Sequence, residues 1–280
     1  MNTQAPAAAR QVAISPATTG PVGEQLRQWR QRRRMSQLDF ACEADISTRH
    51  LSFLETGRSR PSREMVLRLA ELLEVPLRER NILLIAAGFA PVFAERSLQD
   101  PSLNSAREAV DLVLKGHEPY PALAIDRHWT LVAANRAVAP MHAGVAPFLV
   151  EPPVNVLRLS LHPEGLAPRI ANLAQWRAHL FARLRHQIDV SADATLISLL
   201  NELMAYPAPA AHPASINRDH SQFVVPLQMA TPVGVLSFIS TTTVFGTPVD
   251  VTLSELAVES FFPADEATAR ALRTMQMANA

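Results

Sequence analysis

The residues whose types and spacing best suit a chemical role lie in an arginine-rich segment near the N-terminus. Residues 27–63 contain nine arginines and four acidic residues, whereas the whole chain is balanced, with 26 basic and 26 acidic residues. Guanidinium groups form paired hydrogen bonds with phosphates and with guanine edges. The segment therefore predicts a DNA-facing surface. The alternative is that its first arginines only stabilise the C-terminal end of a helix; these are Arg30, Arg32, Arg33 and Arg34.

Five short helices are expected to position this segment. Apolar residues recur at helical spacing between residues 22 and 88, and serines at 36, 47 and 62 stand where N-caps belong. Gly57 suits a left-handed helix stop. In the second helix, Gln37 to Ala44, the inward positions are expected to be Leu38, Ala41 and Cys42, so Cys42 is interpreted as a small buried hydrophobic residue.

The second and third helices, 37–44 and 47–55, are separated by a tight turn at Asp45, which predicts a helix-turn-helix. Three stretches carry a resemblance to a known family: QLD at 37–39, ISTRHLSFLETG at 46–57 and RPS at 60–62. They resemble the Cro/C1-type (xenobiotic-response-element) helix-turn-helix of phage repressors and bacterial regulators. The resemblance implies a DNA-binding set made of Gln37, Ser47, Thr48, Arg49, Phe53, Arg58 and Arg60.

Each of these side chains has its own physical case. Arg49 suits a bidentate contact with guanine, and Phe53 can offer apolar contact to a thymine methyl group. Phe53 could instead pack within the domain. Arg58 and Arg60 are expected to hold phosphate, the alternative being a solvated loop. Ser47 is expected to leave the amino end of the third helix pointing at DNA, and Gln37 to touch a phosphate or a base edge.

Beyond Pro101 the pattern changes to α+β. Two short strands at 122–126 and 130–134 flank Arg127-His128-Trp129 as a hairpin, and Asn135 is expected to cap a helix. Further strands are expected at 222–229, 233–244 and 251–261, and helices at 105–115, 169–186 and 193–206. The predicted fold class is an all-α five-helix domain followed by an α+β, PAS-like domain with an antiparallel sheet.

Two segments of this second region resemble the MmyB-like ligand-binding domain: YPALAIDRHWTLVAAN at 120–135 and VNVLR at 154–158. The resemblance implies a PAS-like sensor that follows the DNA-binding unit and binds a small apolar acid, of fatty-acid type in at least one case. An apolar pocket is expected between the sheet and the helices 169–186 and 193–206.

One arginine of the helix 169–186 stands on its apolar stripe. Arg177 completes the spacing of Ile170, Leu173 and Leu180. A buried guanidinium needs a partner, which predicts an internal salt bridge, a side chain that reaches out to water, or a ligand carboxylate. Trp176 and His179 flank the same region as candidate ligand-binding residues, although an aromatic residue at helical spacing also fits a simple core.

Taken together, the patterns predict a leader at 1–20, a helix-turn-helix domain at 21–94, a linker at 95–104 and a sensor at 105–280. A single cysteine and scattered histidines predict neither a disulfide, a metal site nor a cofactor. The longest apolar run, 82–94, contains Gly88 and Pro91 and is too short to span a membrane, so the chain is expected to be cytoplasmic.

The expected function is a ligand-responsive bacterial transcription regulator that binds a pseudo-palindromic operator as a homodimer. Two alternatives are a small-molecule-converting enzyme and a protein-interaction adaptor with a helix-turn-helix that does not bind DNA. No common catalytic motif occurs in the sequence, which disfavours the enzyme. The basic residues Arg49, Arg58 and Arg60 disfavour the adaptor.

Overall fold

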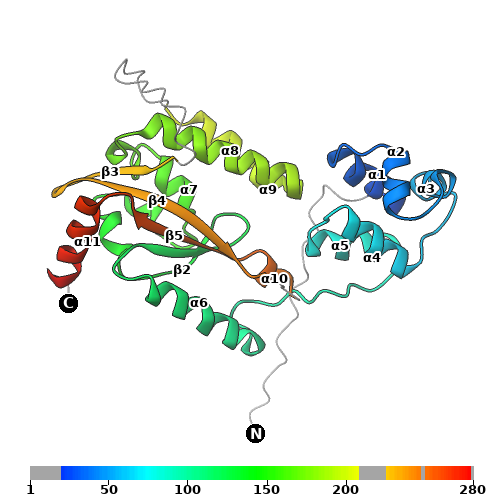
Figure 1. Ribbon diagram of the computed structural model, residues 1–280, viewed down its shortest axis with the longest axis horizontal. Coiled ribbons are helices and arrows are strands. Elements are labelled where there is room, and N and C mark those ends of the chain that lie inside the picture. Colours follow the sequence, from blue (N-terminus) through cyan, green and yellow to red (C-terminus); the bar gives the residue numbers. More distant parts are fainter. Residues whose placement is uncertain (1–19, 208–224, 247–249, 279–280) are drawn as a thin grey trace, which may run out of the picture. The chain divides into compact units, whose positions relative to one another are not determined.

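The computed structural model describes residues 20–207, 225–246 and 250–278 (Figure 1). The described residues form two compact units: 20–74 with 82–90, and 75–81 with 91–278. The fifth helix contributes to both units. Residues 1–19 of the predicted leader and the start of the strand predicted at 222–229 lie outside the described residues, and the predicted domain boundaries stay predictions.

The first unit is helical, as expected. Ser36, Ser47 and Ser62 each accept a hydrogen bond from the backbone N–H three residues later, which confirms the three predicted N-caps. Gly57 has a φ of 72°, the left-handed conformation expected of a helix stop. The helices of this region are α1 (Val22–Arg32), α2 (Gln37–Glu43), α3 (Thr48–Glu55), α4 (Arg63–Leu72) and α5 (Leu77–Ala86).

The inward face of α2 differs from the prediction. Phe40 and Ala44 are fully buried and Ala41 nearly so, whereas Leu38 is 61% exposed and Cys42 is exposed. The buried face of α2 is therefore rotated about the helix axis relative to the predicted face. The reason is that the large ring of Phe40, and not Leu38, fills the core. The interpretation of Cys42 as a buried hydrophobic residue is therefore wrong.

Two features hold α3 against α1. Gly23 lies so close to α3 that a Cβ built on it would be 2.1 Å from the carbonyl oxygen of Leu54. Arg30 forms a buried ion pair with Glu55 at 2.6 Å. These two contacts, one with the backbone of α3 and one with its side chain Glu55, fix the position and the rotation of α3 relative to α1.

The second unit is a mixed α/β domain around a five-stranded antiparallel sheet, in the order β2-β1-β5-β4-β3 within the described residues. The fold class expected for both regions is confirmed. The strands are β1 (Ala122–Ile125), β2 (Leu131–Ala134), β3 (Leu227–Thr231), β4 (Gly234–Val244) and β5 (Ala257–Pro263). The helices are α6 (Asn104–Gly116), α7 (Val156–Leu161), α8 (Leu173–Ser191), α9 (Ala194–Ala205), α10 (Val251–Ser254) and α11 (Glu266–Ala278).

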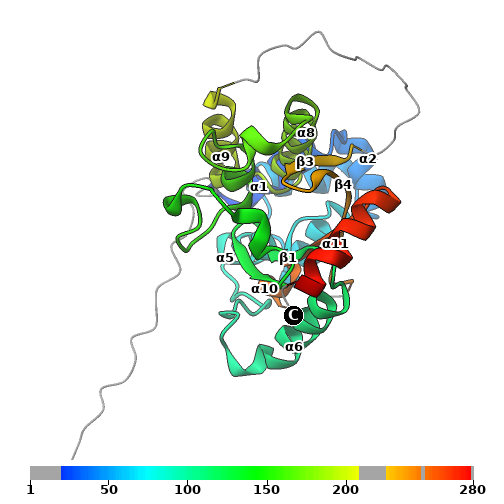
Figure 2. The same cartoon turned by 90° about the vertical axis from the view of Figure 1, so that its left-hand side faces the viewer.

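The sheet lies between α8 and α9 on one side and α6 on the other (Figures 1 and 2). On the α6 side the core is small and consists of residues such as Val110, Leu114 and Val258. On the other side α7, α8 and α9 cover a larger core that contains both Trp129 and Trp176. A short 3-10 helix also lies beyond β2, at Ala139–His142.

Two local predictions for this unit are wrong, and two helices were missed. Residues 251–254, expected to be strand, form α10, because Asp250 caps them by accepting the N–H of Thr252. The helices α7 and α11 were not anticipated. Asn135 caps no helix: its buried amide accepts the N–H of Ala122 and donates to the carbonyls of Leu114 and Tyr120, which ties α6 to β1.

Candidate functional site

The first candidate site is the surface of α3. Ser47 caps the helix by accepting the N–H of His50 at 3.1 Å, and Thr48 and Arg49 are exposed in its first turn. Phe53 is half-buried, with the guanidinium carbons of Arg49 and Arg58 5.3 and 5.9 Å from its ring centroid. A cation over a ring face is attracted by the ring's charge distribution. The structure thus brings Arg49, Phe53 and Arg58 together on one patch.

Two other predicted DNA contacts lie differently. The side-chain nitrogen of Gln37 donates to Glu55 at 2.7 Å, and Glu55 also holds Arg30. Gln37 is therefore anchored at the start of α2 by the carboxylate that fixes α3. Arg60 is exposed in the loop after α3. Direct contact of these residues with DNA stays a prediction.

The second candidate site is an apolar cavity of about 90 Å³ in the second unit. It lies between the sheet and α7 and α8, with the 3-10 helix 139–142 closing one side. The cavity differs from the predicted pocket, because residues of α7 line it together with the sheet and α8, and no described residue of α9 does. Its apolar walls include Leu123, Trp129, Trp176, Leu180, Met229 and Phe261.

A charged pair lines the same cavity. Glu259 lies on the central strand β5, is 4% exposed, and is held by Arg183 of α8 at 2.5 Å. Thr242 of β4, which stands opposite Glu259 in the sheet, donates its hydroxyl to the same carboxylate at 2.7 Å. The guanidinium of Arg183 also lies over Trp129, 4.8 Å from the ring centroid. Neither charged residue was predicted as a site residue from the sequence. A lone acid in the apolar run of β5 was the available signal.

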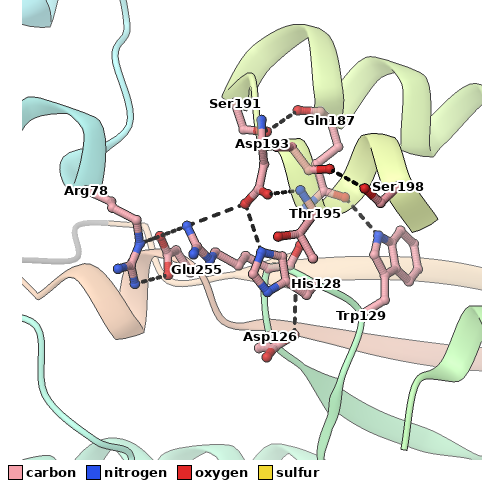
Figure 3. Close-up of polar contacts among 12 residues, drawn as sticks. Arg78, Asp126, His128, Trp129, Gln187, Ser191, Asp193, Thr195, Ser198 and Glu255 are labelled. Atoms are coloured by element: carbon pink, nitrogen blue, oxygen red, sulfur yellow. Dashed lines mark hydrogen bonds and ion pairs between the residues drawn. The ribbon is translucent and has the colours of Figure 1, made fainter. Parts of the chain in front are cut away.

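The polar cluster in Figure 3 fixes Trp129 in the cavity wall. Trp129 has a left-handed φ of 65° and donates its indole N–H to Gln187 at 2.8 Å. His128 before it donates to Asp193 at 2.8 Å, and Asp126 accepts the backbone N–H of both His128 and Thr130. The loop between β1 and β2 is therefore held at several points, which maintains an unusual backbone conformation at a cavity residue.

Asp193 is the central acid of that cluster. It caps α9, accepts from His128, and lies 3.5 Å from Arg127. Burial alone would raise the pKa of Asp193, but the hydrogen bond and charge of His128, the N–H of Thr195 and the charge of Arg127 together hold it well below its ordinary value. Asp193 is therefore ionised at neutral pH. Glu255 of the same cluster pairs with Arg78 at 2.8 Å (Figure 3).

The predicted ligand-binding residues occupy distinct places. Trp176 is buried and lines the cavity. His179 stacks on Trp176 with ring centroids 5.4 Å apart. Arg177 donates to the carbonyl oxygens of Leu203, Met204, Tyr206 and Pro207, so its guanidinium satisfies the last carbonyls of α9. The guanidinium that lines the cavity belongs to Arg183.

A larger, more open hollow of about 560 Å³ adjoins the cavity. It is formed by the ends of β3 and β4, the helix α11 and the 3-10 helix 139–142, and its lining includes Arg169. Met141 and Met229 line both spaces, so these two flexible side chains form the wall between them. Among the described residues, no group of three His, Cys, Asp or Glu side chains could hold a metal ion.

Comparison with known families gives one match in the N-terminal region and one in the C-terminal region. Residues 21–83 match a helix-turn-helix domain family, and residues 106–275 match the family described as MmyB-like transcription regulator ligand binding domain. The chain belongs to the MmyB-like transcription regulators. The family is one of regulators and not of enzymes, which agrees with the expectation that this chain is no enzyme.

The curated proteins compared with this regulator include no match. In the part of the regulator that the structure describes, no helix is long and apolar enough to cross a membrane. The α3 surface and the sheet cavity are accordingly the two candidate sites of a ligand-responsive regulator with a helix-turn-helix.

Proposed function

We propose that this regulator acts in the cytoplasm as a homodimer on a pseudo-palindromic operator, and that a small apolar effector in the sheet cavity controls its DNA binding. The observation that carries the DNA-binding part is the exposed patch of Arg49, Phe53 and Arg58 on a helix whose position is fixed by the buried Arg30–Glu55 pair. Dimerisation follows from the reach of one recognition helix, which reads only a few base pairs.

We propose different roles for the arginines of this surface. Arg49, in the first turn of α3, reads a base edge, and its position against Phe53 limits the directions its guanidinium can take. Thr48 and Phe53 contribute contacts beside it, and Gln37 and Ser47 approach the backbone or a base edge at the helix ends. Arg58 and Arg60, beyond the end of α3, hold phosphates and carry no sequence preference.

Substitution of Arg49 and of Arg60 separates base recognition from phosphate binding. Arg49→Ala is expected to lose about 1–3 kcal/mol of discrimination at one or two base pairs. Arg60→Ala is expected to weaken operator and random DNA alike and to reduce the salt dependence of binding by about one unit of slope. The measurement is a salt titration of binding to both DNAs after footprinting has located the operator. Equal effects of the two substitutions would contradict the assigned roles.

The same footprint tests the dimer. Two half-sites related by symmetry and spaced by about one helical turn are expected. The number of chains bound to the operator, measured by sedimentation, should be two. One chain on an asymmetric site would overturn the homodimer.

The cavity supports the effector part of the proposal because apolar residues form most of its lining and a few polar groups lie among them, the usual composition of a small-molecule site. A carboxylic acid is the effector class that the sequence predicts, and its pairing with Arg177 stays a prediction. Within the cavity wall the guanidinium is that of Arg183, which is paired with Glu259.

A further inference from the structure

The hollow beside the cavity contains a positive charge with no acidic partner among the described residues. Arg169, at the end of a short 3-10 helix (Ala167–Arg169), lines the hollow together with Met229 and Phe238. None of the ion pairs between described residues includes Arg169. Arg183 in the cavity wall differs, because it is paired with Glu259. Arg169 is therefore the guanidinium at which an anionic ligand group meets an unneutralised charge.

The hydrogen bonds of Arg169 leave one edge of its guanidinium for a ligand. Its Nη1 atom donates to the carbonyl oxygens of Met141 and Ala143, both at 2.9 Å, which uses both Nη1 protons. Among the described residues, the other edge makes only weak contacts: Nε lies 3.5 Å from the carbonyl oxygen of Ala230, and Nη2 lies 3.9 Å from the sulfur of Met229. Two parallel N–H groups on one edge match the two oxygens of a carboxylate.

The charge of Arg169 also acts on the cavity. Burial lowers the pKa of His142, a residue of the cavity lining, and the charge of Arg169 lowers it further. The same guanidinium is held by the carbonyl of Met141, which lines both the cavity and the hollow. One ligand can therefore contact Arg169 in the hollow and extend into the cavity.

The two spaces suit different parts of a ligand. The hollow measures about 560 Å³ and contains the guanidinium, whereas the cavity measures about 90 Å³ and is mostly apolar. An engineered apolar cavity that binds benzene measures about 150 Å³, so the cavity of this protein can take the end of an alkyl tail. Met141 and Met229 form the wall between the spaces, and a small movement of either flexible side chain would join them.

We propose that Arg169 binds the carboxylate of the effector in the hollow, and that the alkyl tail of the effector passes between Met141 and Met229 into the cavity. Arg169 is thereby the residue that selects acids over neutral molecules with the same tail. The cavity favours acids whose tail is long enough to reach it. This inference rests on the proposed function, because it takes the cavity to be part of the effector site.

The first test compares three ligands on the full-length protein by calorimetry. Octanoate is expected to bind at least tenfold more tightly than octanol, because only the acid pairs with Arg169. It is also expected to bind at least tenfold more tightly than butyrate, whose tail is too short to fill the cavity. Equal affinity for octanoate and octanol would overturn the carboxylate contact, and equal affinity for octanoate and butyrate would overturn the role of the cavity. No binding of octanoate would overturn both.

The second test locates the tail with brominated acids. Trp129 and Trp176 line the cavity and do not line the hollow, and bromine quenches tryptophan fluorescence only at short range. At saturation, octanoate brominated at its last carbon is expected to quench the fluorescence more strongly than octanoate brominated beside the carboxylate. Equal quenching by the two acids, or stronger quenching by the second, would contradict the proposed orientation.

The third test substitutes Arg169. Arg169→Met keeps an unbranched side chain without the charge, and it is expected to weaken octanoate binding at least tenfold while octanol affinity stays unchanged. A purely structural role would weaken both ligands alike, and that result would overturn the proposal. Arg169→Lys keeps the charge but not the paired N–H edge. Its octanoate affinity is expected to lie between those of the wild type and Arg169→Met, and wild-type affinity in both variants would remove Arg169 from the site.

Two further arginines complete this test. Arg273→Met is the matched control, because Arg273 lies on α11 beside the hollow residue Leu272, pairs with Glu266 at 2.8 Å and does not line the hollow. It should keep the octanoate affinity of the wild type. Arg177→Met examines the guanidinium predicted from the sequence. Loss of octanoate binding in Arg177→Met, with affinity retained in Arg169→Met, would place the carboxylate at Arg177 and overturn the proposal.

Operator binding is measured on the same preparations, which separates this inference from the proposed function. A protein that binds its operator but whose octanoate affinity does not depend on Arg169 refutes the inference alone. A protein that binds octanoate through Arg169 but shows no operator refutes the regulatory function and leaves the ligand site standing.

Discussion

Two histidines in and beside the cavity have a lowered pKa. Burial lowers the pKa of His142 first and the charge of Arg169 lowers it further. Burial also lowers the pKa of His179, helped by Arg183 and opposed by Glu259. Both residues therefore bind a proton less readily in the folded protein than in the unfolded chain.

This difference predicts a loss of stability in mild acid. An unfolded histidine has a pKa of about 6.5, so below that pH the unfolded chain binds more protons than the folded protein, and the free energy of unfolding falls. His142→Gln and His179→Gln should each flatten the dependence of that free energy on pH between about 7 and 5. Urea unfolding of the full chain at several pH values measures it. A slope that both variants share with the wild type would contradict the prediction.

At the scale of single residues, the sequence predicted side chains whose roles are local. The serine caps and Gly57 depend on neighbours three or four positions away, and they were confirmed. The partner of an arginine in the cavity, in contrast, depends on which strand the tertiary fold places against its helix. Arg177 and Arg183 stand on the same helix, yet one meets the end of α9 and the other meets Glu259, which is 76 residues further along the chain.

Among the helices, the position of α3 depends on its approach to α1. Gly23 permits that approach, since any side chain at this position would collide with the backbone of Leu54 and Glu55. A backbone atom cannot move aside as the end of a flexible side chain can. The helix that presents Arg49 is therefore sensitive to a single methyl group on α1.

Gly23→Ala is expected to destabilise the first unit by about 1–3 kcal/mol, the usual result of overpacking. Hydrogen exchange in α1 and α3 should quicken and operator affinity should fall. Gly116→Ala is the control: nothing lies within 4 Å of a Cβ at the end of α6, so a neutral effect or a gain of up to about 1 kcal/mol is expected. Hydrogen exchange in α1 and α3 of Gly23→Ala that is as slow as in the wild type would contradict this prediction. It would show that the two helices accommodate the methyl group without loss of stability.

Element by element, the helices and hairpins with strong caps or alternating patterns were predictable, including the β1–β2 pair and α9 with its Asp193 cap. The buried face of α2 was not predictable, because it depends on which side chain of the helix fills the core. The predicted start of the last strand, at residue 251, was also wrong. The Asp250 cap gives residues 251–254 a helical turn, and β5 begins only at Ala257.

At the scale of the whole molecule, the two sites lie in different units, one of α-helices and one built on a sheet. Regulation requires that effector and DNA favour particular states of the same chain. An effector that binds both states equally shifts nothing, however tightly it binds. The proposal therefore makes a thermodynamic prediction that does not depend on how the units are arranged.

If a carboxylic acid such as octanoate, bound in the cavity, changes the Kd for the operator by some factor, saturating operator must change the Kd for octanoate by the same factor. A factor of about 5 to 150 is expected, the usual range for coupled sites. Two calorimetric titrations, octanoate with and without operator, and operator binding with and without octanoate, provide the comparison. Arg49→Ala serves as the control, since it should weaken operator binding while leaving octanoate affinity without DNA unchanged. Octanoate that binds without altering operator affinity would show that the cavity is occupied but does not regulate, because a ligand acts on DNA binding only through a difference in its own affinity for the two states.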